Sequence, residues 1–396
     1  MHQVRSETWR VLGEDTFRQL RLNSPPDGWF PALQDLSWWI TTSNLPYTDL
    51  LFSPYLKRVS IFVQFPWNVF TVPSDVQSAI TSTISALPTS TLQLLRLYIS
   101  HRMTPWEHFK NSLSSIVLRC GPSFTEYDSP VPLSDAAVNH LIRLPRLRAW
   151  RIYNPPPEYS TSSLPLVFPP LEQLTLEERA VNGWLSLFKR LEDGVFTAQG
   201  TTPLSGVKES LNSLHIWGLP DQIIDASFTS PIQRFQNLVK LKVKVSCYGE
   251  VGVGQCTFKL NDDHVAELAT ALPQLGSLLL GYVCPKNTCA TTVACLLHIS
   301  AHCVKLHRLV IHFNTTNIVD DFKKISEDPR FQELRSRSKC TLTFLGADQI
   351  PLILDEPGFE TVAKGMIDIF PSLRRCDGDG RGWDELSMRI LKFQEE

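Results

Sequence analysis

The sequence lacks any long uninterrupted hydrophobic run, although 43% of its 396 residues are hydrophobic. A membrane-spanning helix needs about 18–20 consecutive apolar residues, and no stretch of the chain approaches that length. The first residues, Met1–Arg10, also lack an apolar core and a small-residue cleavage site, so no signal peptide is expected. We therefore expect an intracellular protein, cytoplasmic or nuclear, without membrane contact. Its 9 cysteines are then expected to be free thiols.

Charge of one sign is also scarce, because the formal net charge is only -2. A protein that binds nucleic acid or a membrane surface through a global field usually carries a strong excess of positive charge. Nucleic acid is therefore a disfavoured partner, and an electrostatic signal must come from local placement of charges.

Motifs that carry catalysis or hold cofactors are missing as well. The glycine-rich segment Gly249–Gly254 has no lysine followed by serine or threonine to meet phosphates. Cys284, Cys289, Cys295 and Cys303 lack the second tight pair typical of zinc sites. No serine-nucleophile elbow or cysteine–histidine signature is present. We predict no catalytic, cofactor or metal residues and no enzyme, with an unmarked active site on the scaffold as the alternative.

What the sequence does contain is a recurring phrase: an apolar residue, two variable residues, a second apolar residue, one variable residue and a third apolar residue. The second and third apolar residues alternate with polar ones, so they share one face of a short strand. One strand cannot bury that face alone, whereas stacked copies can. Copies begin at Leu33, Leu56, Leu92, Leu113, Leu147, Leu171, Leu211, Leu238, Leu275 and Leu306, with a weaker one at Leu373.

Several phrases follow a segment that predicts a helix closed by proline. Ser134 and Asn261 are expected helix caps, and 74–87 and 357–370 repeat the scheme. The uneven intervals indicate insertions, such as the segments 155–170 and 194–206. The predicted fold is an irregular α/β leucine-rich-repeat solenoid, with a curved parallel sheet of short strands and helices and loops outside.

The segments Phe30–Trp38, Leu144–Leu147 and Phe370–Leu373 make the chain resemble the leucine-rich-repeat region of fungal F-box proteins, particularly those of mushroom-forming fungi. In that family, an amino-terminal F-box docks on a Skp–cullin ubiquitin ligase, and the repeats present a target for ubiquitin transfer. Residues 1–30 contain no Leu-Pro opening followed by an apolar helix, so the docking residues are not carried over. A Skp-type adaptor is expected as a partner only if an F-box precedes this sequence.

The resemblance and the repeats together give a domain expectation. Residues 1–30 are expected to form an amino-terminal cap or remnant segment, and 31–396 the solenoid. The last repeat, near 357–390, is expected to act as a carboxy-terminal cap.

The side chains between and after the anchors should point into the concave face of the sheet, where they are rich in basic and aromatic residues. Exposed Arg, Tyr and Trp are common in protein interfaces. His215 and His312 are expected at exposed strand positions. The predicted protein-binding residues are Arg96, Tyr98, Arg119, Arg151, Tyr153, His215, Trp217, Lys240, Lys242, Lys244 and Arg308.

The strictest alternation lies in Val239–Val245, where three lysines are predicted to share the open face. Such a patch would steer an acidic segment of a partner protein. We therefore predict a non-catalytic module that recognises a protein target, with substrate recognition for an F-box-type ubiquitin ligase as its finer form. Besides the enzyme alternative, a purely structural scaffold stays open, in which the lysines only keep exposed strands solvated.

Overall fold

The computed structural model describes residues 3–5, 14–25, 29–41, 44–63, 74–99, 107–153, 170–178, 207–218, 224–244, 258–281, 289–337, 339–379 and 381–395. The chain forms two compact units. Unit 1 comprises Met1–Glu158 with Ser163–Leu174, and unit 2 comprises Tyr159–Ser162 with Thr175–Glu396. Of the expected loop 155–170, residues 155–169 lie outside the described residues, as do the expected loop 194–206, Cys284 and Gly249–Gly254.

In unit 1 the strands follow one another in the sheet in sequence order, and every described pairing is parallel. The register places the second anchors opposite one another, so Leu36, Val59, Leu95, Tyr127 and Trp150 form one buried row. The strands are β1 (Gln3–Arg5), β2 (Asp35–Ile40), β3 (Arg58–Val63), β4 (Leu94–Ile99), β5 (Glu126–Asp128) and β6 (Ala149–Tyr153).

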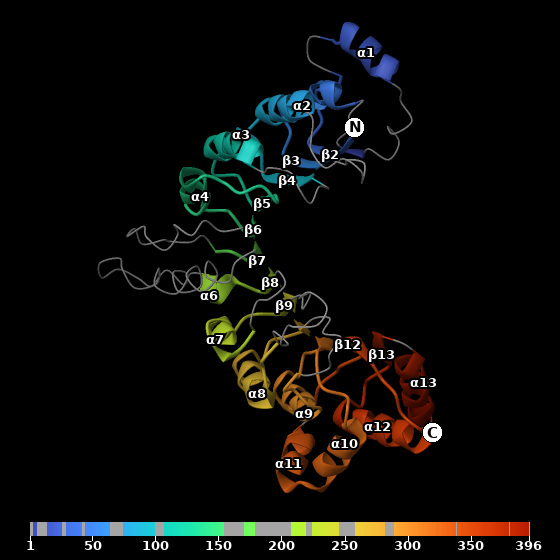
Figure 1. The fold of residues 1–396 in the computed structure, drawn as a ribbon. Helices are drawn as coiled ribbons and strands as arrows, with labels where there is room; N and C mark the ends of the chain where they lie inside the picture. The colour runs from blue at the N-terminus through green and yellow to red at the C-terminus, as the bar shows by residue number, and fades with distance from the viewer. Residues whose placement is uncertain are drawn as a thin grey trace, which may run out of the picture. The chain divides into compact units, whose positions relative to one another are not determined.

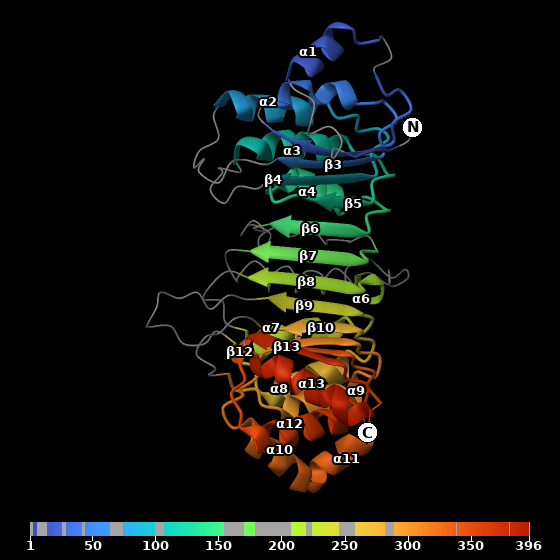
Figure 2. The same ribbon diagram turned by 90° about the vertical axis from the view of Figure 1, so that its right-hand side faces the viewer.

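Unit 2 repeats the arrangement, again with parallel neighbours in sequence order. Its buried row contains Leu214, Leu241, Leu278, Leu309 and Leu345, followed by Cys376. Figure 2 shows β8 and β9 running side by side. The strands are β8 (Ser213–Gly218), β9 (Lys240–Lys244), β10 (Ser277–Leu280), β11 (Arg308–Ile311), β12 (Phe344–Pro351) and β13 (Arg375–Asp379), while β7 (Gln173–Glu178) spans the unit boundary.

Helices follow most strands and pack against the helices of neighbouring repeats, as α2 does with α3 and α8 with α9. In both units they lie to one side of the strands (Figure 1). Those of unit 1 are α1 (Glu14–Leu22), η2 (Leu45–Leu51), α2 (Ser74–Ser85), α3 (Glu107–Arg119) and α4 (Asp135–Leu141). Those of unit 2 are α6 (Val207–Ser210), α7 (Ala226–Thr229), η4 (Ile232–Arg234), α8 (Asp262–Ala271), α9 (Ala294–His302), α10 (Ile318–Glu327), α11 (Pro329–Arg337), α12 (Glu356–Ile369) and α13 (Arg381–Glu395).

The helix caps read from the sequence are present. The Ser134 hydroxyl accepts from the Ala137 N–H at 3.4 Å, and the side-chain amide oxygen Oδ1 of Asn261 accepts from the His264 N–H at 2.9 Å. Both caps satisfy backbone donors that the first helical turn leaves unpaired. Parallel strands in sequence order, buried anchors on one strand face and helices beyond them define an irregular leucine-rich-repeat solenoid, as predicted.

One predicted strand is wrong. The phrase Leu113–Leu118 belongs to α3, where Leu113, Ile116 and Val117 are buried at helical spacing. Leu118, which should be the third anchor, is 45% exposed. The true strand of this repeat is β5, whose anchor positions hold Phe124, Tyr127 and Ser129 instead of leucines. The strands β1 and β12 were also not predicted; β12 carries Leu342, Leu345 and Ala347 as its anchors.

Candidate functional site

The candidate site is the strand face opposite the buried anchors, which we call the open face. Strand alternation places every second side chain on it. Its burial alternates accordingly: in β9, Lys240, Lys242 and Lys244 are half-buried, whereas Leu241 and Val243 are fully buried.

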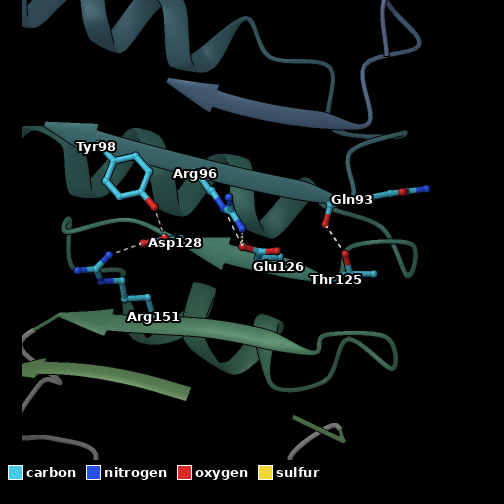
Figure 3. Close-up of polar contacts among 7 residues, drawn as sticks. All are labelled: Gln93, Arg96, Tyr98, Thr125, Glu126, Asp128 and Arg151. Atoms are coloured by element: carbon cyan, nitrogen blue, oxygen red, sulfur yellow. Dashed lines mark hydrogen bonds and ion pairs between the residues drawn. The ribbon is translucent and has the colours of Figure 1, made fainter. Parts of the chain in front are cut away.

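In unit 1 the charges of the open face are paired across strands (Figure 3). Arg96 of β4 donates to Glu126 of β5, with Nε 2.7 Å from Oε1. Asp128, the next open-face residue of β5, accepts the Tyr98 hydroxyl at 2.6 Å and Arg151 Nη1 at 3.4 Å. Burial, and then the hydrogen bond to Asp128, raise the pKa of Tyr98 to about 12.

Beside this network, aromatic rings stack along the open face. Trp39, Phe62 and Tyr98 occupy equivalent positions on β2, β3 and β4. Their ring centroids are 4.7 and 4.9 Å apart, with interplanar angles of 13° and 5°. This separation equals the strand spacing, so the stack follows directly from the parallel register. Within unit 1, these charged side chains therefore pair with one another, and these aromatic rings stack on one another.

In unit 2 the open face is basic, and carboxylates of the described residues do not pair with its positive charges across strands as they do in unit 1. Lys240, Lys242 and Lys244 lie on β9, and Arg308 lies two strands away on β11. Among the described residues, Lys240, Lys242 and Arg308 have no acidic partner within ion-pair distance. Burial, and then the positive charges of Lys240, Arg308 and Lys244, lower the pKa of the Lys242 ammonium. Like charges therefore repel one another on this face.

Two aromatic side chains accompany these cations. Lys244 Nζ lies 5.4 Å from the ring centroid of Trp217, its partner on β8, and Trp217 is 39% exposed. Arg308 Cζ lies 4.3 Å from the ring centroid of Phe344, and Arg375 Cζ lies 5.8 Å from the same ring. Cation–π contacts of this kind hold a long side chain in place without neutralising its charge.

The structure thus divides the predicted binding residues between the two units. Arg96, Tyr98 and Arg151 lie on the open face of unit 1, where they are already paired. His215, Trp217, Lys240, Lys242, Lys244 and Arg308 lie on that of unit 2. Tyr153 belongs to β6, and its side chain lies outside the described residues.

Two predicted positions need correction. Arg119 is not on the sheet, because it ends α3 and donates to the backbone oxygens of Ser115 and Ser85. The error arose because the phrase Leu113–Leu118 matches the strand pattern but lies in α3. His312 is not exposed, since only 1% of it is accessible. It directly follows β11 and is buried, and its ring meets Phe258 edge-on.

The open-face residues Glu126, Asp128 and Phe344 were not found from the sequence, because β5 and β12 were missed. Glu126 and Asp128 alternate with Tyr127 between the aromatic anchor Phe124 and Ser129. A search that allows aromatic residues at the first two anchors and serine at the third would have found β5, and with it Glu126 and Asp128.

The chain matches no family model, and no curated protein sequence matches it significantly. A solved structure described as the crystal structure of the Rad7 and Elc1 complex in yeast is similar to it, with 14% sequence identity and a TM-score of 0.42. The match covers 93% of this chain and 73% of the other. The fold assignment therefore rests on the strand order and register given above.

A search of the described helices for a transmembrane span found none with the length and apolar character to cross a bilayer.

Proposed function

We propose that this chain is a non-catalytic protein-recognition module that binds an acidic segment of a partner protein on the open face of unit 2. The observation that carries the proposal is the group of neighbouring cations on β9 and β11, of which Lys240, Lys242 and Arg308 have no acidic partner among the described residues. The open face of unit 1 differs, because its arginines are matched by carboxylates on adjacent strands.

Physical reasoning favours an extended acidic ligand. The cations are spread over several strands and do not converge on one point, so a single small anion would meet few of them. An exposed ion pair contributes only ~0–1 kcal/mol, so useful affinity requires several pairs formed together. A carboxylate placed among these cations would also offset the charge repulsion that, after burial, contributes to lowering the pKa of Lys242. Trp217 adds an exposed aromatic surface of the kind often found at interface centres.

The test compares a variant carrying Lys240→Glu, Lys242→Glu and Lys244→Glu with wild type, using a fluorescent oligoglutamate peptide as the probe. The matched control carries Lys259→Glu, Lys339→Glu and Lys392→Glu, which changes the net charge equally at exposed positions off the strands. We expect wild type and control to bind the peptide with an affinity that falls with salt, and the β9 variant to lose binding. Equal binding by all three folded proteins would contradict the proposal.

The same test also distinguishes a nucleic-acid partner from a protein partner. A single-stranded oligonucleotide of equal charge should bind more weakly than the peptide. Tighter oligonucleotide binding that requires the same lysines would replace a protein partner with a nucleic acid.

The finer form of the proposal is recognition of a target on behalf of a ubiquitin ligase. It is supported by the leucine-rich-repeat phrases of the sequence that resemble those of fungal F-box proteins. Docking on a Skp-type adaptor would need a free apolar helix near the amino terminus. In α1, Phe17 is buried, stacked on Tyr47 at a centroid distance of 5.8 Å and edge-on to Trp38 at 6.1 Å. We therefore expect no co-purification of this chain with a Skp-type adaptor; a stable complex in size-exclusion chromatography would show that the chain contains a docking helix.

A further inference from the structure

Three basic residues of unit 2, Lys240, Arg308 and Arg375, fall on alternate strands of one row. The register places one open-face residue from each strand opposite its neighbours. From β8 to β13 the row reads Ser213, Lys240, Ser277, Arg308, Phe344 and Arg375. The cations are therefore separated by Ser277 in one interval and by Phe344 in the next.

This alternation fixes the distance between successive cations of the row. Neighbouring strands lie about 4.8 Å apart, so residues on alternate strands are about 9.6 Å apart. A polyproline II helix has three residues per turn and a rise of ~3.1 Å, which puts every third side chain on one face at ~9.3 Å. A β-strand repeats its face every ~6.7 Å, and two turns of an α-helix span ~10.8 Å. Over two intervals, only the polyproline II repeat stays within about 1 Å of the row.

The row also contains groups suited to such a ligand. Phe344 lies between two guanidinium groups, with Arg308 the closer at 4.3 Å from the ring centroid. Stacking on a ring occupies the face of a guanidinium and leaves its N–H edge available for a carboxylate. Arg375 also contacts Asp377 at 3.4 Å, so Lys240 and Arg308 are the two cations expected to contribute most. The Ser277 hydroxyl lies in the row between them.

We propose that the partner segment is a polyproline II stretch that crosses β9 to β13 and carries an acidic residue at every third position. The inference rests on the proposed function and specifies its ligand. Successive carboxylates meet Lys240, Arg308 and Arg375, while the intervening residues lie over Ser277 and Phe344. Aromatic surfaces are a common platform for proline rings in this conformation.

The experiment uses the full chain and two synthetic peptides of identical composition, each made of glutamate and proline. In one peptide glutamate stands at every third position; in the other the same glutamates stand at every second position at one end. Fluorescence anisotropy is recorded for wild type, for Arg308→Gln and for Arg374→Gln. Arg374 is the exposed residue beside β13 that precedes the row, so its replacement is a matched loss of charge. Thermal unfolding confirms that the variants are folded.

We expect the three-residue spacing to bind about tenfold more tightly than its isomer, since it allows one more charge-assisted hydrogen bond. Arg308→Gln should abolish this preference, and Arg374→Gln should retain it. If both peptides bind wild type equally and with the same salt dependence, the spacing proposal is wrong while the acidic-ligand proposal stands. If neither peptide binds, both proposals are wrong.

Discussion

His312 shows how a single buried side chain couples this fold to pH. Neither of its ring nitrogens has a hydrogen-bond partner among the residues that the structure describes, and burial lowers the pKa of the imidazole to about 4. Gly281 lies against it with a φ of 111°, and a Cβ there would come within 2.6 Å of the His312 Cβ. The glycine is therefore needed both for its backbone conformation and for the space that the histidine occupies.

We predict that His312 makes unit 2 less stable in acid. The folded pKa lies below the ordinary value of 6.5, so its contribution to stability is present above pH 6.5 and is lost as the pH falls towards 4. The loss amounts to up to ~3 kcal/mol of unfolding free energy. His312→Leu should remove this pH dependence and cost little at pH 7, because it replaces an unpaired polar ring by an apolar group.

Urea unfolding at several pH values between 4 and 7.5 measures this, with His307→Leu, at an exposed position, as the control. An unchanged pH dependence in His312→Leu would show that other groups govern acid unfolding.

At the scale of the element, the sequence predicted strands where all three anchors are large apolar residues and missed β5 and β12, whose third anchors are Ser129 and Ala347. Leu211–Ile216 and Leu306–Ile311 lead directly into β8 and β11. In α3, by contrast, Leu113 and Ile116 fit both the strand phrase and a helical face, because their spacing of three suits either structure. Only the packing against α2 and α4 shows which one forms.

The strand pattern also explains which parts of the candidate site could be predicted from the sequence. The lysines of β9 were correctly placed on one face because Leu241 and Val243 alternate strictly with them. The pairing of Arg96 and Arg151 could not be predicted, because it depends on which strand lies beside them. Register is a property of stacked repeats and is not contained in any single phrase.

Contacts between helix starts also join the repeats. Asp262, the first residue of α8, accepts the Thr292 N–H at 2.8 Å and the Thr292 hydroxyl at 2.7 Å, just before α9 begins. We predict that Asp262→Ala lowers the unfolding free energy by about 1–3 kcal/mol, because it leaves a part-buried backbone donor unpaired. Asp263→Ala, one residue later in the same turn and exposed, should cost less than about 1 kcal/mol through the helix dipole alone. Chemical denaturation of both variants measures the difference, and equal losses would contradict this role.

At the scale of the whole molecule, the described strands of each unit pair with their neighbours in sequence order. Stability in such an array is approximately a sum over repeats and their interfaces, so a local defect stays local. Asp128 is a suitable place to introduce one, because its removal leaves both the Tyr98 hydroxyl and the Arg151 guanidinium without this acceptor.

We therefore predict that Asp128→Ala speeds amide hydrogen exchange in β4, β5 and β6 and leaves β10 to β13 at the wild-type rate. Mass-spectrometric exchange under native conditions resolves these segments. Asp135→Ala, an exposed helix residue of the same unit, is the control. Faster exchange throughout the chain would mean that the protein unfolds as one cooperative body.

The row from Ser213 to Arg375 has a consequence for how such a protein evolves. Its residues alternate with the buried anchors, so each can change without altering the core that holds the strands in register. Under the proposed mode of binding, a mutation at one of these positions would alter the ligand preference at one fixed point, and duplication of a repeat would lengthen the row by one strand spacing. New specificities can thus arise by small steps at little cost in stability, while the leucine phrases stay under constant selection for folding.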